Sequence, residues 1–225
     1  MDNAVIYLLP VGRGRFELYA EPLDEGAGGE PDGLWRRHAH RLHTRWRDAV
    51  RDARHERTAD ATIFAHARDW TVRRTADAIA EQRALWTLRR AGSAVLVHPA
   101  DLSPAQAEAV RGRLLVAART HHARWLLVDA VVFVASGVFV LVPGPNVIAY
   151  YFAFRVVGHF FSWRGARQAL QSTMWRLRPE PALAELGQLA ALPRDARASR
   201  LDAIASRLNL PRLAAFFDRT AAPAR

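Results

Sequence analysis

The feature that most constrains this chain is a pair of apolar segments joined by a very short turn. The segments span 126–142 and 147–163, and the turn between them consists of Pro143, Gly144, Pro145 and Asn146. Because proline lacks a backbone donor, a helix that enters this turn must end there. Asn146 can accept a backbone hydrogen bond at the start of the next helix. The sequence therefore predicts a helical hairpin.

The length and the flanks of this hairpin favour a bilayer as its surroundings. Each segment offers about 17 residues, or roughly 25 Å of helix, close to the ~30 Å of a hydrocarbon core. The turn is uncharged, whereas arginines lie outside both open ends of the hairpin: Arg111, Arg113, Arg119, Arg124, Arg164, Arg167, Arg176 and Arg178. Because basic flanks stay cytoplasmic, we expect an inner-membrane protein with a transmembrane hairpin over 125–163 and both termini in the cytoplasm. The alternative is the buried central hairpin of a soluble α-helical domain.

Length and charge bound the classes of protein that remain. The chain has 225 residues, enough for one domain or for a smaller unit with a membrane hairpin. Its formal net charge is +10, and all 32 basic residues are arginine. This excess attracts anionic lipid headgroups or nucleic acid, and with the hairpin present we expect an anionic bilayer as partner. Cysteine is absent, which excludes disulfides and thiolate metal sites. We expect no cleavable signal peptide.

Short β-rich runs predict a small sheet. Residues 5–9 and 16–20 flank a glycine-containing turn, a pattern typical of a β-hairpin. Residues 94–98, followed by a proline, predict a third strand, which an isolated hairpin needs for its stability. The expected fold class is therefore mostly α with a small antiparallel β element, and with the transmembrane hairpin flanked by cytoplasmic helices.

The rest of the chain is predicted to be linker and helix. The expected divisions are a β-hairpin over 1–20, a flexible linker over 21–33, a basic α-helical region with the third strand over 34–124, the transmembrane hairpin over 125–163, and a C-terminal helical region over 164–225. One helix start is well marked, because Ser103 can cap it, Pro104 suits the first position and Gln106 completes a capping box. We expect this helix to continue almost unbroken into the first apolar segment.

Several stretches resemble a known family. They are 141–147, 150–155 and 158–159, then 80–86 with 98–102, and 7–12 with 16–19. The most specific of them is the Pro-Gly-Pro-Asn turn, followed by an aromatic run and Arg155. Over about 5–170, the chain resembles the mitochondrial potassium/proton exchange-related family, which has bacterial members. The resemblance implies a membrane protein associated with potassium/proton exchange, as an accessory factor, and it supplies no catalytic residues.

The polar residues inside the apolar pair form the candidate site. If the two helices run antiparallel about the turn, Asp129 and His159 lie at nearly the same depth, with Arg155 one helical turn away. An unpaired arginine within a membrane costs about 2.5 to 3.5 kcal/mol, so Asp129 is its expected partner. One hypothesis is a proton-responsive group in which His159 titrates near neutral pH. The other is that the three residues lie at the headgroup boundary and only fasten the hairpin.

Other chemistry has little support in the sequence. Of the histidines in 38–43, only His40 and His43 lie within one turn of a helix, and no hydrolase signature is recognisable. We therefore expect no enzyme activity, no cofactor, no metal site and no small-molecule substrate.

The size of the hairpin limits what it can do in ion transport. One hairpin cannot enclose an ion path, so we expect an accessory subunit or regulator of ion homeostasis, in a homo-oligomer or with a larger membrane partner. A membrane-tethered scaffold without transport activity is one alternative. A nucleic-acid-binding helical protein, using the arginines of 36–57 and 194–212, is another.

Overall fold

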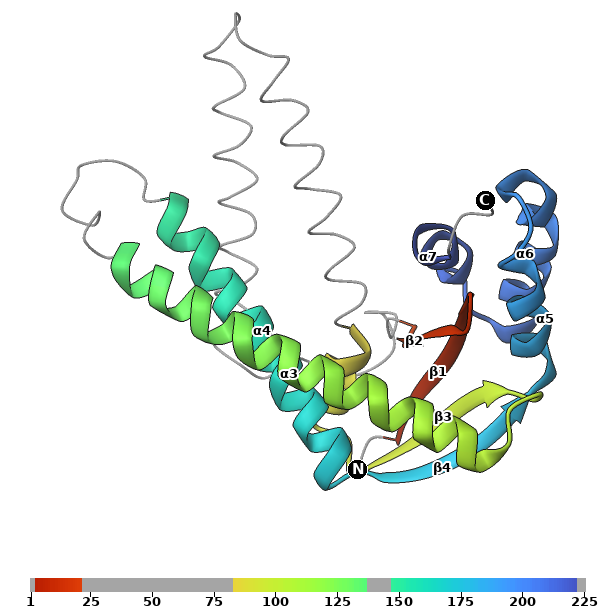
Figure 1. The fold of residues 1–225 in the computed structure, drawn as a ribbon, viewed down its shortest axis with the longest axis horizontal. Helices are drawn as coiled ribbons and strands as arrows, with labels where there is room; N and C mark the ends of the chain where they lie inside the picture. Colours follow the sequence, from red (N-terminus) through yellow and green to blue (C-terminus); the bar gives the residue numbers. More distant parts are fainter. Residues whose placement is uncertain (1–2, 22–82, 137–146, 222–225) are drawn as a thin grey trace, which may run out of the picture. The chain divides into compact units, whose positions relative to one another are not determined.

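The computed structural model describes residues 3–21, 83–136 and 147–221 (Figure 1). In chain order, the elements are β1 (Asn3–Gly12), β2 (Arg15–Tyr19), β3 (Ser93–Pro99), α3 (Pro104–Ser136), α4 (Val147–Gln171), β4 (Met174–Glu180), α5 (Pro181–Leu189), α6 (Arg194–Leu208) and α7 (Leu213–Thr220). Residues 83–88 form a further short helix.

The four strands form one sheet in the order β2-β1-β3-β4. β1 and β2 pair as an antiparallel hairpin, and its turn contains Gly12, Arg13 and Gly14, all with positive φ. Such dihedrals are what a tight hairpin turn requires, and glycine adopts them without strain. β1 pairs with β3, and β3 pairs with β4, in parallel. A parallel pair needs a long crossover, which α3 and α4 supply between β3 and β4.

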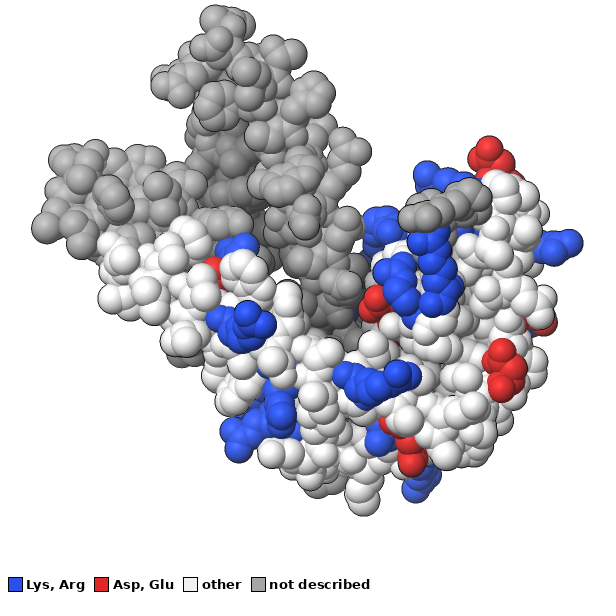
Figure 2. Space-filling view, in the orientation of Figure 1, with Lys and Arg blue, Asp and Glu red and all other residues white. Residues whose placement is uncertain are grey.

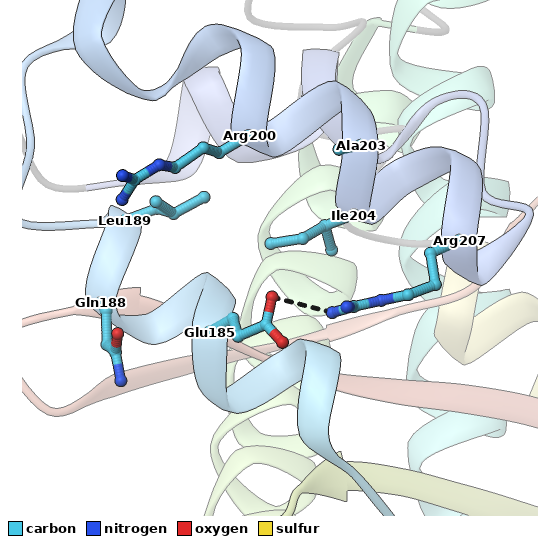
Figure 3. Close-up of a pocket in the computed structure, with 7 residues that line it drawn as sticks. All are labelled: Glu185, Gln188, Leu189, Arg200, Ala203, Ile204 and Arg207. Carbon is cyan, nitrogen blue, oxygen red and sulfur yellow. Dashed lines mark ion pairs between the residues drawn. The ribbon is translucent and has the colours of Figure 1, made fainter.

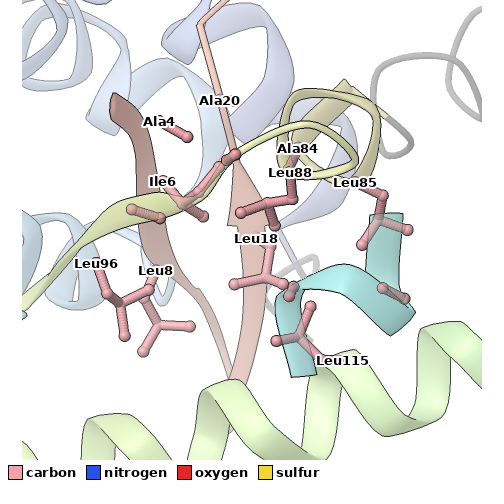
Figure 4. Close-up of a cluster of buried hydrophobic side chains, with 14 of the residues drawn as sticks. Ala4, Ile6, Leu8, Leu18, Ala20, Ala84, Leu85, Leu88, Leu96 and Leu115 are labelled. Carbon is pink, nitrogen blue, oxygen red and sulfur yellow. The ribbon is translucent and has the colours of Figure 1, made fainter. Parts of the chain in front are cut away.

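Two hydrophobic cores lie on opposite faces of this sheet. β3 alternates between them: Ala94 and Leu96 belong to the first core, whereas Val95 and Val97 pack in the second. The first core is covered by helix 83–88, α3 and α4 (Figure 4), and the second by α5, α6 and α7. A strand that is apolar on both faces is typical of the middle layer of an α/β/α arrangement.

The start of α3 confirms the predicted capping box. The backbone N–H of Ser103 donates to Gln106 Oε1 at 2.8 Å, and the backbone N–H of Gln106 donates to Ser103 Oγ at 3.3 Å. These reciprocal bonds satisfy donors that the first helical turn leaves free. From here α3 runs without a break to Ser136, as the sequence predicts.

The expected fold class is wrong. The sheet is mixed and largely parallel, it contains β4, which the sequence did not predict, and helices cover both of its faces. Among the described residues, none of the helices combines the length and the apolar character that crossing a bilayer requires. This finding contradicts the transmembrane hairpin and the inner-membrane location, and it removes the basis for assigning the termini to the cytoplasm.

The physical reason lies in the polar side chains that interrupt the two apolar segments. Asp129 lies in the first segment, and Arg155 and His159 lie in the second, where a helix that spans a bilayer needs an almost continuous apolar run. The contacts of these helices with the sheet lie outside the two segments, at Ala107, Val110 and Leu115 of α3 and at Ala166 and Ala169 of α4, all buried in the first core.

A close approach holds α4 against helix 83–88. A Cβ atom at Gly165 would overlap the backbone carbonyl of Leu85, so only glycine fits at this crossing. Nearby, the indole N–H of Trp86 donates to Ser162 Oγ at 2.9 Å. Ser162 Oγ in turn donates to the carbonyl of Gly158 at 2.9 Å. These contacts fix the level at which α4 crosses the short helix.

Candidate functional site

The structure brings Asp129, Arg155 and His159 into direct contact between α3 and α4. Arg155 Nε lies 3.0 Å from Asp129 Oδ2, and His159 Nε2 lies 3.3 Å from the same oxygen. The Asp129 side chain is only 2% exposed, so water does little to compensate its charge. Arg155 and His159 reach it together because they are one helical turn apart on α4. Whether the group responds to protons stays a prediction.

His122 extends this group and was not among the predicted site residues. It is buried on α3, and its Nδ1 lies 2.8 Å from His159 Nδ1. A signal was present in the sequence, since His122 precedes Asp129 by two helical turns and therefore shares its face of the helix.

The contacts define how protons are placed when both rings are neutral. His159 donates its Nε2–H to Asp129, so its Nδ1 carries a lone pair. His122 must then donate its Nδ1–H to that lone pair. The group is therefore a chain of donors that runs from His122 through His159 to the buried carboxylate.

Burial disfavours protonation of both rings. It is the main cause that lowers the pKa of His122 to about 4, and the charges of His159 and His121 act in the same direction. The pKa of His159 is also lowered, first by burial, and Arg155 adds to this effect while Asp129 opposes it. Both rings are therefore neutral at pH 7, and acidification must insert charge into a buried site.

The turn residues Pro143, Gly144, Pro145 and Asn146 lie outside the described residues, as do the histidines of 38–43 and the arginines of 36–57. In the part of the chain that is described, no group of three or more His, Asp or Glu side chains is arranged to hold a metal ion.

Large apolar side chains are exposed on both helices that carry the polar group. We define the outer face as the exposed apolar side chains that point away from the contact between these helices, namely Leu127, Val131 and Val134 of α3 with Phe154 and Val157 of α4. On α3, the exposed fractions are 68%, 61% and 75%, and on α4 they are 56% and 47%. Figure 2 shows mainly uncharged surface in this part of the molecule, with separate basic patches. So many large apolar side chains on one pair of helices are typical of a surface that binds a partner.

A shallow groove of about 450 Å³ lies between α5 and α6 (Figure 3). Leu189 and Ile204 form its apolar part, and an ion pair of 2.9 Å between Arg207 Nη2 and Glu185 Oε2 crosses it. Both members of this pair are about half exposed, so it contributes little stability.

The arginines of α6 are largely engaged by carboxylates. Arg194 and Arg197 both bind Asp218 of α7, at 3.0 and 2.8 Å. Arg207 binds Glu185. Arginines that already bind carboxylates within the protein are poorly suited to contact phosphates, and this weakens the nucleic-acid alternative.

Comparison with known proteins supports the family resemblance. Residues 64–174 match the model of a family described as mitochondrial K+-H+ exchange-related, which confirms the resemblance over this span. The span contains β3, α3 and α4, and with them all four residues of the polar group, but it leaves out the β1–β2 hairpin. No curated protein and no solved structure matches the chain.

Proposed function

We propose that this protein, which is related to potassium/proton exchange through residues 64–174, is an accessory subunit or regulator of that process. The observation that carries the proposal is the buried chain from His122 through His159 to Asp129 and Arg155, which lies within the matched residues. Buried groups with shifted pKa values concentrate at functional sites. A regulator of proton exchange needs a titratable group of this kind to respond to the proton concentration.

The contacts suggest how the response works. When His159 takes up a proton at Nδ1, its Nε2–H still bonds to Asp129, but His122 must now offer a lone pair instead of a proton. When His122 takes up a second proton, the Nδ1 atoms of both rings carry hydrogen and neither can accept. The separation of 2.8 Å between these atoms is then no longer stabilised by a hydrogen bond. Acidification therefore weakens the contact between α3 and α4. We propose that this weaker contact is the change that a partner protein detects.

The proposal assigns transport itself to other protein chains. Two helices cannot surround an ion path, so the protein would act on a larger exchanger subunit or in an assembly of several copies. The outer face supports this part of the proposal, because it offers an apolar surface on the same two helices that carry the polar group. Loosening of α3 against α4 would then change the surface that the partner contacts.

Ion flux in cells that lack the protein tests the proposal. Potassium-driven proton flux is measured between pH 4.5 and 7.5 after complementation with the wild type, with His159→Ala or with Thr120→Ala as the control. Thr120 is exposed on α3 and carries no titratable group, so its replacement should leave the flux unchanged. We expect the His159→Ala protein to be present at the wild-type level, and we expect the flux in these cells to depend less on pH than in cells with the wild type. The same pH dependence in His159→Ala and the wild type would refute proton sensing.

A scaffold without any role in ion flux is the second candidate, and the outer face favours it. The same experiment separates the two functions, because loss of a scaffold leaves potassium-driven proton flux unchanged.

A further inference from the structure

β4 is an edge strand that keeps one side free of other described strands. The strand order places β3 on one side of it, and among the described residues no strand lies on the other. Figure 1 shows β4 at the outer border of the sheet. Its seven residues pair with β3 in an unbroken register, whereas at the other edge the pairing of β1 with β2 has a register shift near Pro10. β4 is therefore the straighter edge of the sheet.

The backbone groups of β4 that point away from β3 can be assigned. The N–H of Met174 donates to the carbonyl of Gly92, and the carbonyl of Glu180 accepts from the N–H of Ala100. In a parallel pair the bonds alternate, so every second residue of β4 between these two faces β3. Trp175 and Leu177 therefore direct their N–H and carbonyl groups outward, and Pro179 directs only a carbonyl.

The charged side chains in the first part of this edge are both positive, whereas Glu180 at the end of the strand caps α5. Arg176 and Arg178 are exposed and lie on the sheet face that bears α5, α6 and α7, since they align with Val95 and Val97. Trp175 and Leu177 are half-buried on the opposite face, against the first core. A strand added here would meet two arginines on one face and apolar side chains on the other.

We propose that the outward edge of β4 binds an extended acidic segment of another protein as a fifth strand. Backbone bonds to Trp175 and Leu177 would supply the pairing, and acidic side chains at every second position would meet Arg176 and Arg178. A second copy of this chain does not fit, because a twofold axis would bring the arginines of one β4 opposite those of the other. Pro179 limits the pairing to the first part of the strand.

Binding of a synthetic peptide to the full-length protein tests this inference. The probe is a capped hexapeptide of alternating glutamate and valine, and the control peptides replace glutamate with lysine or carry N-methyl groups at alternate amides. With 15N-labelled protein, we expect the acidic peptide to cause saturable shifts at the amides of Trp175 and Leu177, and neither control peptide to do so. Equal shifts from the lysine peptide, or none from the acidic one, would overturn the inference.

Two variants separate the edge from the rest of the fold. Leu177→Pro removes an outward N–H and some packing against the first core but none of the bonds to β3, so we expect a less stable but folded protein that no longer binds the acidic peptide. Exchange of both Arg176 and Arg178 for glutamate should weaken binding of the acidic peptide at least about tenfold and favour the lysine peptide. Undiminished binding of the acidic peptide by Leu177→Pro would overturn the inference. So would a wild-type protein that is a dimer and becomes a monomer on this substitution, because a second copy would then occupy the edge.

Discussion

Removal of the Asp129 carboxylate should destabilise the protein strongly, because two donors depend on one buried acceptor. Breaking a buried ion pair by removing one partner costs about 3 to 5 kcal/mol, mostly because the other charge is left uncompensated. The Arg155 side chain is 32% exposed, so water compensates part of its charge. We therefore expect Asp129→Ala to lower the free energy of unfolding by a smaller amount, roughly 2 to 3 kcal/mol.

Urea unfolding at pH 7.5, followed by far-ultraviolet circular dichroism, measures this loss. Asp129→Asn is the matched control, since it keeps the size and one acceptor oxygen, and it should cost about 1 to 2 kcal/mol. The double replacement of Asp129 and Arg155 by leucine removes both charges but leaves the buried His159 Nε2–H without its acceptor, so it should recover about 1 kcal/mol of the loss rather than all of it. If Asp129→Ala unfolds within about 0.5 kcal/mol of the wild type, the ion pair does not hold α3 to α4 and the reasoning is refuted.

Three further predictions concern stability. Gly165→Ala should cost at least about 2 kcal/mol in thermal unfolding because its Cβ meets a backbone carbonyl, whereas Gly112→Ala, with open space around it in a helix, should stabilise by about 0.5 to 1 kcal/mol. In urea unfolding, Arg197→Ala should lower the free energy of unfolding by about 2 kcal/mol, because this arginine is 5% exposed and binds a carboxylate. The side chain of Arg194 is 75% exposed, so Arg194→Ala should stay within about 0.5 kcal/mol of the wild type. The pKa of His122 is lowered to about 4, so the stability that depends on its neutral form is complete above pH 6.5 and is lost as the pH falls towards 4, by about 1 kcal/mol per pH unit. His122→Phe should flatten this pH profile in urea titrations, and an unchanged profile would show that another group controls it.

Local chemistry explains which elements the sequence predicts well. The β1–β2 hairpin depends on glycines with positive φ in its turn, and the start of α3 depends on Ser103 and Gln106, all of which are close together in the sequence. β4 has no comparable local signal, because two arginines and a proline interrupt its apolar residues. Its pairing with β3 joins residues about 80 positions apart, and such contacts leave no trace in a short window of sequence.

The polar group was only partly accessible from the sequence. The spacing of Asp129, Arg155 and His159 about a turn was enough to predict that they meet, because antiparallel helices place residues equidistant from the turn at the same level. The sequence does not predict the contact of His122 with His159, because this contact depends on how the helices are rotated about their axes. The packing against the sheet determines that rotation. The surroundings of the apolar pair were predicted wrongly because its overall apolar composition was given more weight than the three polar residues within it.

The position of the polar group along the two helices gives the proposed response a direction. Ala107, Leu115 and Ala166 fasten one end of the α3–α4 pair to the sheet through apolar burial, which does not depend on pH. The histidines and the ion pair lie further along the helices, so their contribution to the contact is the part that protons can remove. Acidification should therefore loosen the pair at the end beyond the sheet and leave the sheet end packed. Because the outer face lies on that same far part of the helices, a partner bound there would sense the change while the fold as a whole persists.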